Sequence, residues 1–200
     1  VVFIFKPVFF IVFYGLIIIG NAQESISYFK RAREIRFINP DSAETIALEG
    51  LKKLNAKQEI LLAAKFYNLL GNIYTVQGEV NKCDSVYRIA ISYAYKVGND
   101  TMLSNIYNNL GQVYIDYGSY KTTDSLLQLA LKHALKFGNP FYIADTYNNL
   151  GTLNMTYKYN QKAVKFFELG IENYRKLKST SIESQIGVAD ISNNIGEVYY

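Results

Sequence analysis

Tyr107-Asn108-Asn109-Leu110-Gly111 is repeated forty residues later as Tyr147-Asn148-Asn149-Leu150-Gly151. An earlier copy reads Tyr67-Asn68-Leu69-Leu70-Gly71, and a weaker one reads Ser192-Asn193-Asn194-Ile195-Gly196. The four glycines therefore stand 40, 40 and 45 residues apart, at positions 71, 111, 151 and 196. A nearly constant period of this length is typical of stacked repeat arrays. The chain is thus predicted to be built from successive copies of one structural unit.

Each unit has the apolar pattern of two helices joined by a short turn. If Ala64 is position 1, then Gly71 is position 8, and a first helix runs to about Gln77. Gly78 breaks it, and a second helix is predicted from Val80 to Val97. Glycine or another small residue recurs at positions 8, 20 and 27, and larger apolar residues recur at 4, 7, 11 and 24. Small residues allow helix axes to approach within about 8–10 Å, and the large ones fill the space beside them.

This register divides the chain into six segments. The stretch Lys178–Glu183 is predicted to be a linker, since the period lengthens there. An atypical first pair is what the end of a repeat array requires. The predicted segments are a signal peptide or N-terminal membrane anchor (1–22), a degenerate capping helix pair (24–63), three repeats (64–103, 104–143 and 144–188) and the start of a fourth repeat (189–200).

The motif set closely resembles the tetratricopeptide repeat family. The first repeat matches it with Tyr67, Leu70-Gly71, Tyr74, Gly78, Cys83, Tyr87 and Ala90. The resemblance implies an all-α fold, a right-handed superhelix of antiparallel helix pairs, with extended repeats like those of kinesin light chains. Thr123 at position 20, Asn154 at position 11 and Ser192 at position 4 depart from the family pattern and leave the local packing there open.

The first twenty residues differ from the rest. Val8–Ile19 carries no charge, follows Lys6-Pro7 and precedes Gly20-Asn21-Ala22-Gln23. A basic residue, a short apolar stretch and small residues are typical of a secretory signal peptide. An uncleaved membrane anchor and a buried core helix are the alternatives. Both the signal peptide and the membrane anchor predict that the repeats lie outside the cytoplasm, in a periplasmic or membrane-associated protein.

Composition and charge favour no nucleic-acid partner. The 200 residues carry a net charge of +4. The basic run Lys30–Arg36 is interpreted as one solvated helix face, with an anionic partner as the alternative. The single cysteine, Cys83, falls at a small packed position and is interpreted as a core residue rather than a nucleophile.

The sequence offers no catalytic residue, metal ligand set or cofactor motif. The one histidine, His133, is expected to be a solvated residue at a helix end, where positive charge is favourable. Asp124, Ser125 and His133 do not make a triad, because eight or nine residues of helix separate them by about 12 Å. No second histidine or cysteine pair indicates a metal site.

The asparagines indicate a binding surface instead. Position 5 is Asn68, Asn108, Asn148 and Asn193 in the four repeats. In the tetratricopeptide family this face of the first helix lines a concave groove, and an amide can donate to and accept from a peptide backbone. The alternative is that these asparagines bond to the preceding second helix and fix the stacking. The candidate groove residues are Lys65, Asn68, Asn72, Asn105, Asn108, Gln112, Asp145, Asn148, Thr152 and Asp190.

These features together favour a non-catalytic module that binds a protein or peptide segment. The exported array resembles the sensor region of bacterial histidine kinases and LuxR-like regulators, which implies a sensing or scaffolding part of a larger signalling protein. A stand-alone periplasmic or membrane-anchored assembly scaffold, and an accessory region of an enzyme with its catalytic domain beyond residue 200, are the alternatives.

Overall fold

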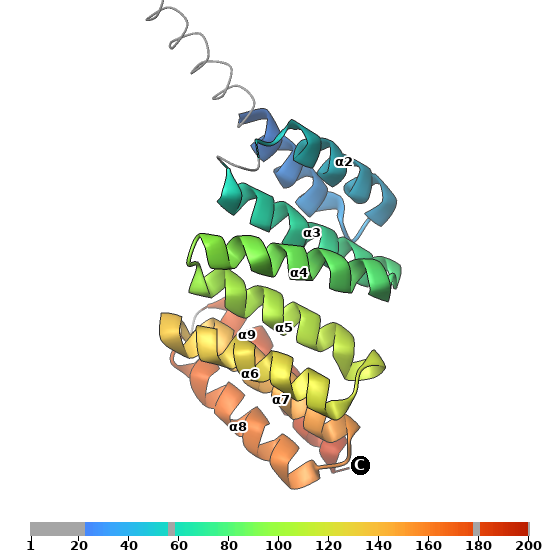
Figure 1. Ribbon diagram of the computed structural model, residues 1–200. Coiled ribbons are helices and arrows are strands. Elements are labelled where there is room, and N and C mark those ends of the chain that lie inside the picture. Colours follow the sequence, from blue (N-terminus) through green and yellow to red (C-terminus); the bar gives the residue numbers. More distant parts are fainter. Residues whose placement is uncertain (1–22, 56–58, 178–180, 200) are drawn as a thin grey trace, which may run out of the picture. The chain divides into compact units, whose positions relative to one another are not determined.

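The computed structural model describes residues 23–55, 59–177 and 181–199, and within these ranges all regular structure is helical (Figure 1). Residues 23–35 form a helix, and the elements that follow are joined by short turns. These elements are α2 (Pro40–Lys53), α3 (Ile60–Gln77), α4 (Val80–Lys96), α5 (Asp100–Tyr117), α6 (Tyr120–Phe137), α7 (Pro140–Thr156), α8 (Asn160–Arg175) and α9 (Ile182–Val198). The all-α fold predicted from the repeat is confirmed.

The chain divides into two compact units, Val1–Tyr93 and Ala94–Tyr200. In the first unit, Gly50 of α2 lies so close to α3 that a Cβ added to it would stand 2.6 Å from the ring of Phe66. The same Phe66 ring packs edge-on against Phe29 of the helix over 23–35, with centroids 5.4 Å apart. Ala43 and Ala47 are also fully buried. The small residues predicted for the first helix pair therefore lie at close helix contacts.

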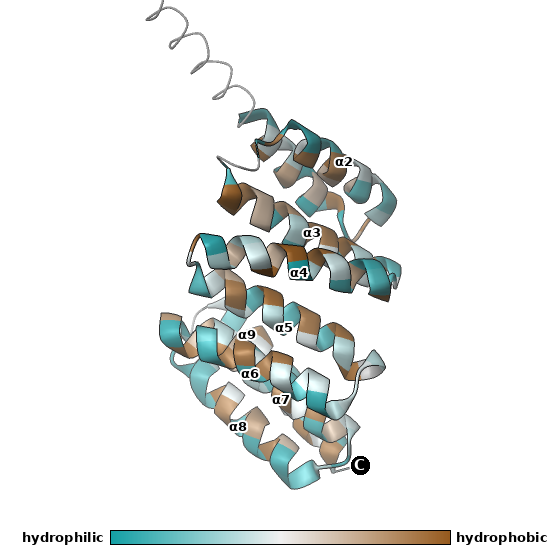
Figure 2. Ribbon diagram, in the orientation of Figure 1, coloured by the Kyte–Doolittle hydropathy of each residue, from teal (hydrophilic) through white to brown (hydrophobic). Residues whose placement is uncertain are grey.

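In the second unit, α5 packs against α6 and α7 packs against α8, each pair joined by a short turn that makes the helices antiparallel. Contacts also join α6 to α7 and α8 to α9, and the first helices of successive pairs touch, α5 with α7 and α7 with α9. Figure 2 shows hydrophobic and hydrophilic residues around the same helices, for example α6 and α8. Each helix thus has an apolar side to bury against a neighbouring helix.

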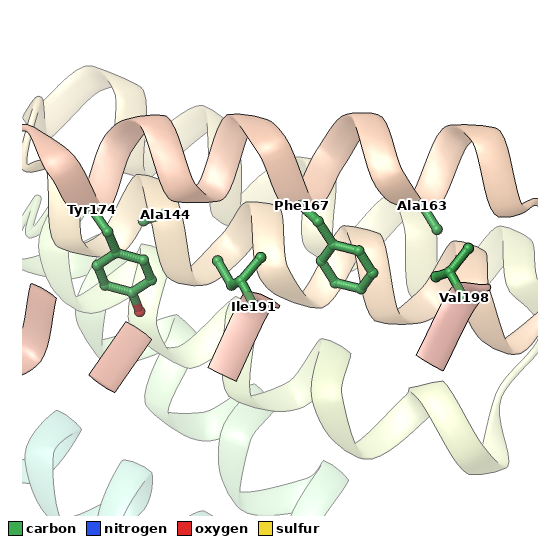
Figure 3. Close-up of a cluster of buried hydrophobic side chains, with 6 residues drawn as sticks. All are labelled: Ala144, Ala163, Phe167, Tyr174, Ile191 and Val198. Carbon is green, nitrogen blue, oxygen red and sulfur yellow. The ribbon is translucent and has the colours of Figure 1, made fainter. Parts of the chain in front are cut away.

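The core of the second unit next to α9 is drawn in Figure 3. Phe167 and Tyr174 project from α8 toward α9, which contributes Ile191 and Val198. The backbone of α7 is close as well, since a Cβ on Gly170 of α8 would lie 3.3 Å from the carbonyl oxygen of Ala144. One layer of side chains therefore holds α7, α8 and α9 together.

In three successive helix pairs, the repeated glycine contacts the residue at the same repeat position. A Cβ on Gly71 would lie 2.3 Å from Tyr87, one on Gly111 would lie 2.5 Å from Leu127, and one on Gly151 would lie 2.4 Å from Phe167. In each case a position-8 glycine faces the large residue at position 24. Gly196, the weak fourth copy, has no described atom within 4 Å of such a Cβ. In the first three copies, equivalent positions of the sequence repeat therefore make equivalent packing contacts.

Left-handed backbone ends several of the helices. Gly78, Gly98 and Gly138 have φ of 74°, 61° and 76°, a conformation that glycine adopts without steric cost. The third repeat has Lys158 in place of the turn glycine, and Lys158 adopts φ of 61°. The turn at Lys158 therefore has the left-handed form of the turn at Gly78, whereas the equivalent Gly118 of the second repeat is extended, with φ of −99°.

The first helices of the repeats begin earlier than position 1. The structure starts α5 at Asp100 and α7 at Pro140, and the side chains of Asn99 and Asn139 accept hydrogen bonds from the first-turn N–H groups. Ser181 caps α9 in the same way, so the predicted linker Lys178–Glu183 already contains the start of a helix. The linker prediction was wrong at that end because a cap was overlooked.

Two departures from the family pattern are accommodated by hydrogen bonds. The Thr123 hydroxyl donates to the carbonyl oxygens of Tyr114 at 2.8 Å and Ser119 at 3.1 Å. The fully buried Asn154 donates to the Leu150 carbonyl at 2.7 Å and accepts from the Tyr120 hydroxyl at 3.0 Å. Both polar groups are satisfied, so the positions remain part of the packed interior.

The predicted signal or anchor segment, 1–22, lies outside the described residues. Among the helices that are described, none combines the length and apolar character that crossing a membrane requires.

Candidate functional site

The predicted groove residues lie on the first helices of the repeats. Lys65, Asn68 and Asn72 lie on α3 in the first unit, where Lys65 is exposed and the two asparagines are half-buried. The Asn72 side chain accepts a 2.6 Å hydrogen bond from the hydroxyl of Tyr87, the residue that packs on Gly71. Asn72 therefore helps to hold α3 against α4.

The other seven lie in the second unit, and the structure links several of them across helices. We call this polar surface of α5, α7 and α9 the amide face. Of the seven predicted residues, Gln112 and Asp190 are exposed, Asn108 is buried and the other four are half-buried. The amide face consists of Asn105, Asn108, Gln112, Asp145, Asn148, Thr152 and Asp190, together with Asn193 and Asn194.

Asn108 and Asp145 form the central contact of the amide face. The side-chain amide of Asn108 on α5 donates a 2.6 Å hydrogen bond to the Asp145 carboxylate on α7. Asn108 is only 4% exposed, whereas Asp145 is half-buried. The bond therefore joins the first helices of two successive repeats and leaves the carboxylate at the surface end.

A second side-chain hydrogen bond joins the first helices of the next two repeats, here with the donor on the later helix. Asn194 of α9 donates from its side-chain amide to the side-chain oxygen of Asn148 on α7, at 2.9 Å. Thr152 is tied locally, since its hydroxyl donates to the Asn148 carbonyl at 3.1 Å. Sequence reasoning missed Asn194, although the Asn-Asn doublet that repeats at 108–109, 148–149 and 193–194 was a signal for it.

Two of the four position-5 asparagines, Asn108 and Asn148, join helices of neighbouring repeats, but not the helices that were expected. The expected partner was the preceding second helix, whereas Asn108 and Asn148 bond to the first helix of the following repeat. This occurs because α5 contacts α7, and α7 contacts α9, directly. Asn148 is half-buried and so contributes both to the stacking and to the polar surface, whereas Asn108 is buried and contributes to the stacking.

The electrostatics of the amide face are negative around Asp145. Burial raises the pKa of the Asp145 carboxyl to about 6, and the hydrogen bond from Asn108 opposes this only in part. The pKa of the buried Tyr174 hydroxyl is also raised, first by burial and then by the charges of Asp145 and Asp190. Tyr174 therefore lies within the field of both carboxylates.

The interpretation of His133 as a solvated residue was wrong. His133 is 9% exposed, its ring lies parallel to the Tyr107 ring with centroids 5.9 Å apart, and its Nδ1 is 2.8 Å from Asp100. Lys136 also binds Asp100, at 2.7 Å, and the two basic groups hold the pKa of that carboxyl below its usual value. His133 is near the end of α6, as expected, but it contacts Asp100 at the start of α5 and is buried.

Reactive groups elsewhere are few among the described residues. Cys83 is fully buried, with its sulfur 3.2 Å from the Thr75 hydroxyl, and burial raises the pKa of its thiol. The predicted core position of Cys83 is confirmed. Within the described ranges, no group of three His, Cys, Asp or Glu side chains is arranged to hold a metal ion.

A cavity of about 480 Å³ lies at another place in the second unit, where α7 begins and α8 ends. None of the ten predicted groove residues lines it, so this cavity and the amide face are different surfaces. Its lining residues are Asn139, Phe141, Tyr142, Leu177, Ser181 and Glu183.

Comparisons with known proteins identify the fold alone. No family model matches the sequence, and no curated protein matches it. Among solved structures, the chain is similar to BtubC (BKLC) from P. vanneervenii, with a TM-score of 0.67 and 18% sequence identity. The similarity covers 91% of this chain and 84% of that one. At this identity, the match supports the arrangement of helices and carries no function with it.

Proposed function

We propose that the chain is a tetratricopeptide-like repeat module that binds a peptide or protein segment along the amide face. The observation that supports this most is the pair of hydrogen bonds Asn108–Asp145 and Asn148–Asn194, which join side-chain amides and a carboxylate between the first helices of successive repeats. An extended peptide needs donors and acceptors in alternation, and amides supply both. These hydrogen bonds also hold the groups in place before a ligand arrives, which lowers the entropic cost of binding.

Specificity in this proposal comes from the exposed members of the face. Gln112 and Asp190 make no hydrogen bond or ion pair described for the folded chain, so their side chains are available to a ligand. Asn108 is enclosed and serves as support. Position 5 is asparagine in every repeat, whereas positions 2 and 9 vary along the array, as specificity residues do. Position 2 is Lys65, Asn105, Asp145 and Asp190, and position 9 is Asn72, Gln112, Thr152 and Glu197.

The wider role that fits these features is the sensing or scaffolding part of a larger bacterial signalling protein outside the cytoplasm. Its support is the signal-like sequence Val8–Ile19 ahead of the repeats. A stand-alone assembly scaffold and an accessory region of an enzyme are the other candidates, and they share the same binding face.

The experiment is a selection followed by titration. Peptides selected on the immobilised chain from a random library are titrated calorimetrically into the wild type and into a Gln112→Ala, Asp190→Ala double variant. Both residues are exposed, so the variant keeps its fold, and we expect its affinity to fall about tenfold or more. The matched control is Lys121→Ala, Glu168→Ala, at exposed sites on α6 and α8.

Equal binding to the wild type and to the Gln112 and Asp190 variant would refute the amide face as the site. Failure to select any peptide would refute the peptide-binding function itself. Circular dichroism of each variant verifies that helicity is unchanged.

A further inference from the structure

Asp145 is a carboxylate that the Asn108 amide holds in place and that has no positive partner in the described part of the chain. It lies half-buried on α7, and within the described ranges no ion pair links it to a lysine, arginine or histidine. Its one described bond is the 2.6 Å contact from the Asn108 amide. A charge that is taken partly out of water and left unpaired is costly, so a site of this kind favours a cation.

Asn108 gives an independent indication that the cluster lacks hydrogen-bond donors. It is 96% buried, being 4% exposed, and its side-chain oxygen is enclosed and accepts no hydrogen bond from the described residues. Native structures leave few such groups unpaired. The Asn108 oxygen is closed to solvent and the Asp145 carboxylate only accepts, so a ligand that complements Asp145 supplies N–H groups.

Among the described residues, the repeat positions that form the amide face add negative charge and no positive charge. Asp190, which occupies on α9 the repeat position that Asp145 occupies on α7, acts with Asp145 on the Tyr174 hydroxyl. Tyr174 projects from α8 toward α9 (Figure 3). The repeat positions 2, 5 and 9 of the second unit contain no lysine or arginine; they are Asn105, Asn108, Gln112, Asp145, Asn148, Thr152, Asp190, Asn193 and Glu197.

From these observations we infer that Asp145, supported by Asn108 and flanked by Asp190, is a subsite for one cationic side chain, a lysine ammonium or an arginine guanidinium. This inference rests on the proposed function and specifies its partner, a peptide with a basic residue at the amide face. The chain as a whole carries a net charge of +4, so general attraction would not favour such a peptide. Recognition has to come from the local carboxylates.

The test uses small probes, so that it does not depend on finding the peptide. Ethylguanidinium and n-butylammonium are titrated into the isotopically labelled chain at millimolar concentrations, with the neutral ethylurea as the matched control. We expect both cations, and not ethylurea, to shift the Asp145 carboxyl carbon and Asn108 amide signals saturably. We also expect the bound cation to lower the pKa of Asp145, because a positive neighbour favours the carboxylate.

Two variants separate the subsite from general charge. Asp145→Asn keeps the shape and the acceptor for Asn108, and it should abolish saturable binding. Glu168→Gln removes the same charge from an exposed site on α8 and should leave binding unchanged. The inference is refuted if ethylurea gives equal shifts, if Asp145→Asn still binds, or if both variants lose binding equally.

Failure here is distinguishable from failure of the proposed function. If no cation binds but selected peptides still depend on Gln112 and Asp190, the amide face remains the binding site and the cationic subsite is wrong. If the cations bind at Asp145 and no peptide is selected, the subsite stands alone.

Discussion

Gly151 of α7 lies directly beneath the Phe167 ring of α8, so closely that a Cβ on the glycine would stand 2.4 Å from Cδ1 and Cε1 of that ring. No real Cβ contact is this short, so any side chain at residue 151 has to move a fully buried ring. The same relationship joins Gly111 to Leu127 and Gly71 to Tyr87. The period of the sequence is therefore the period of one steric contact.

Gly151→Ala is expected to destabilise the chain. Alanine favours helix by about 1 kcal/mol over glycine, but displacing the Phe167 ring costs about 1–3 kcal/mol by overpacking. Denaturant unfolding followed by circular dichroism measures the balance. Gly196→Ala is the control, since no described atom lies within 4 Å of its added Cβ, and it should gain about 0.5–1 kcal/mol from helix propensity alone. A gain at Gly151 equal to that at Gly196 would show that the glycine contact is loose.

Lys158→Gly is expected to stabilise the turn between α7 and α8. Lys158 is exposed and has φ of 61°, which costs a residue with a Cβ about 1–2 kcal/mol. Glycine removes that strain but gains freedom in the unfolded chain, so the net gain is about 0.5–1 kcal/mol. The reverse change, Gly78→Lys at φ of 74°, should lose a similar amount. The prediction fails if the two midpoints shift in the same direction.

The helix pairs could be predicted from the sequence because the same packing contact recurs with the same period as the sequence motif. Gly71, Gly111 and Gly151 each lie against the large side chain at position 24 of the same repeat. This contact therefore places glycine at a fixed spacing in the sequence. Resemblance to the tetratricopeptide family remains a proposal, since no family model matches. The sequence therefore predicts the helix pairs, which are the part of the fold that recurs.

The contacts between repeats could not be predicted in the same way. Asn108 and Asp145 are 37 residues apart and meet because of how α5 and α7 are rotated against each other. No pattern in one chain records that rotation. The burial of His133 was missed for a related reason, since it depends on Asp100 and Tyr107 from another helix.

Asn154→Ala is expected to destabilise the second unit. It removes the acceptor of the Tyr120 hydroxyl and a donor to the Leu150 carbonyl from a fully buried position. Leaving buried polar groups without partners costs about 1–3 kcal/mol. Adding Tyr120→Phe removes the hydroxyl that donates to Asn154 and that also accepts a 2.7 Å hydrogen bond from Lys162 Nζ, so the double variant should lose less than the sum of the two single variants. Additive losses in this double-mutant cycle, measured by denaturant unfolding, would mean that the two side chains do not interact.

Asp145 makes the free energy of unfolding depend on pH, and this dependence has the opposite sign to that of an ion-paired carboxylate. Burial raises the pKa of Asp145 to about 6 in the folded chain, whereas an unfolded aspartate has a pKa of about 3.9. Between these values the folded state binds more protons than the unfolded state, so the contribution of Asp145 to stability falls as pH rises through this window. Asp100, whose pKa is lowered by Lys136 and His133, contributes with the opposite sign and loses its contribution as pH falls through its folded pKa.

Asp145→Asn isolates the contribution of Asp145 from the others. Asparagine cannot ionise, so the variant avoids the cost of burying a charge and should gain stability relative to the wild type as pH rises from 4 to 7. The difference between the unfolding free energies of the two proteins is expected to change by about 1 kcal/mol or more over this range. Urea unfolding at half-unit steps of pH measures it, and Glu168→Gln, at an exposed site, should show no such trend. A constant difference between the wild type and Asp145→Asn would mean that the Asp145 carboxyl titrates alike in the folded and unfolded chain.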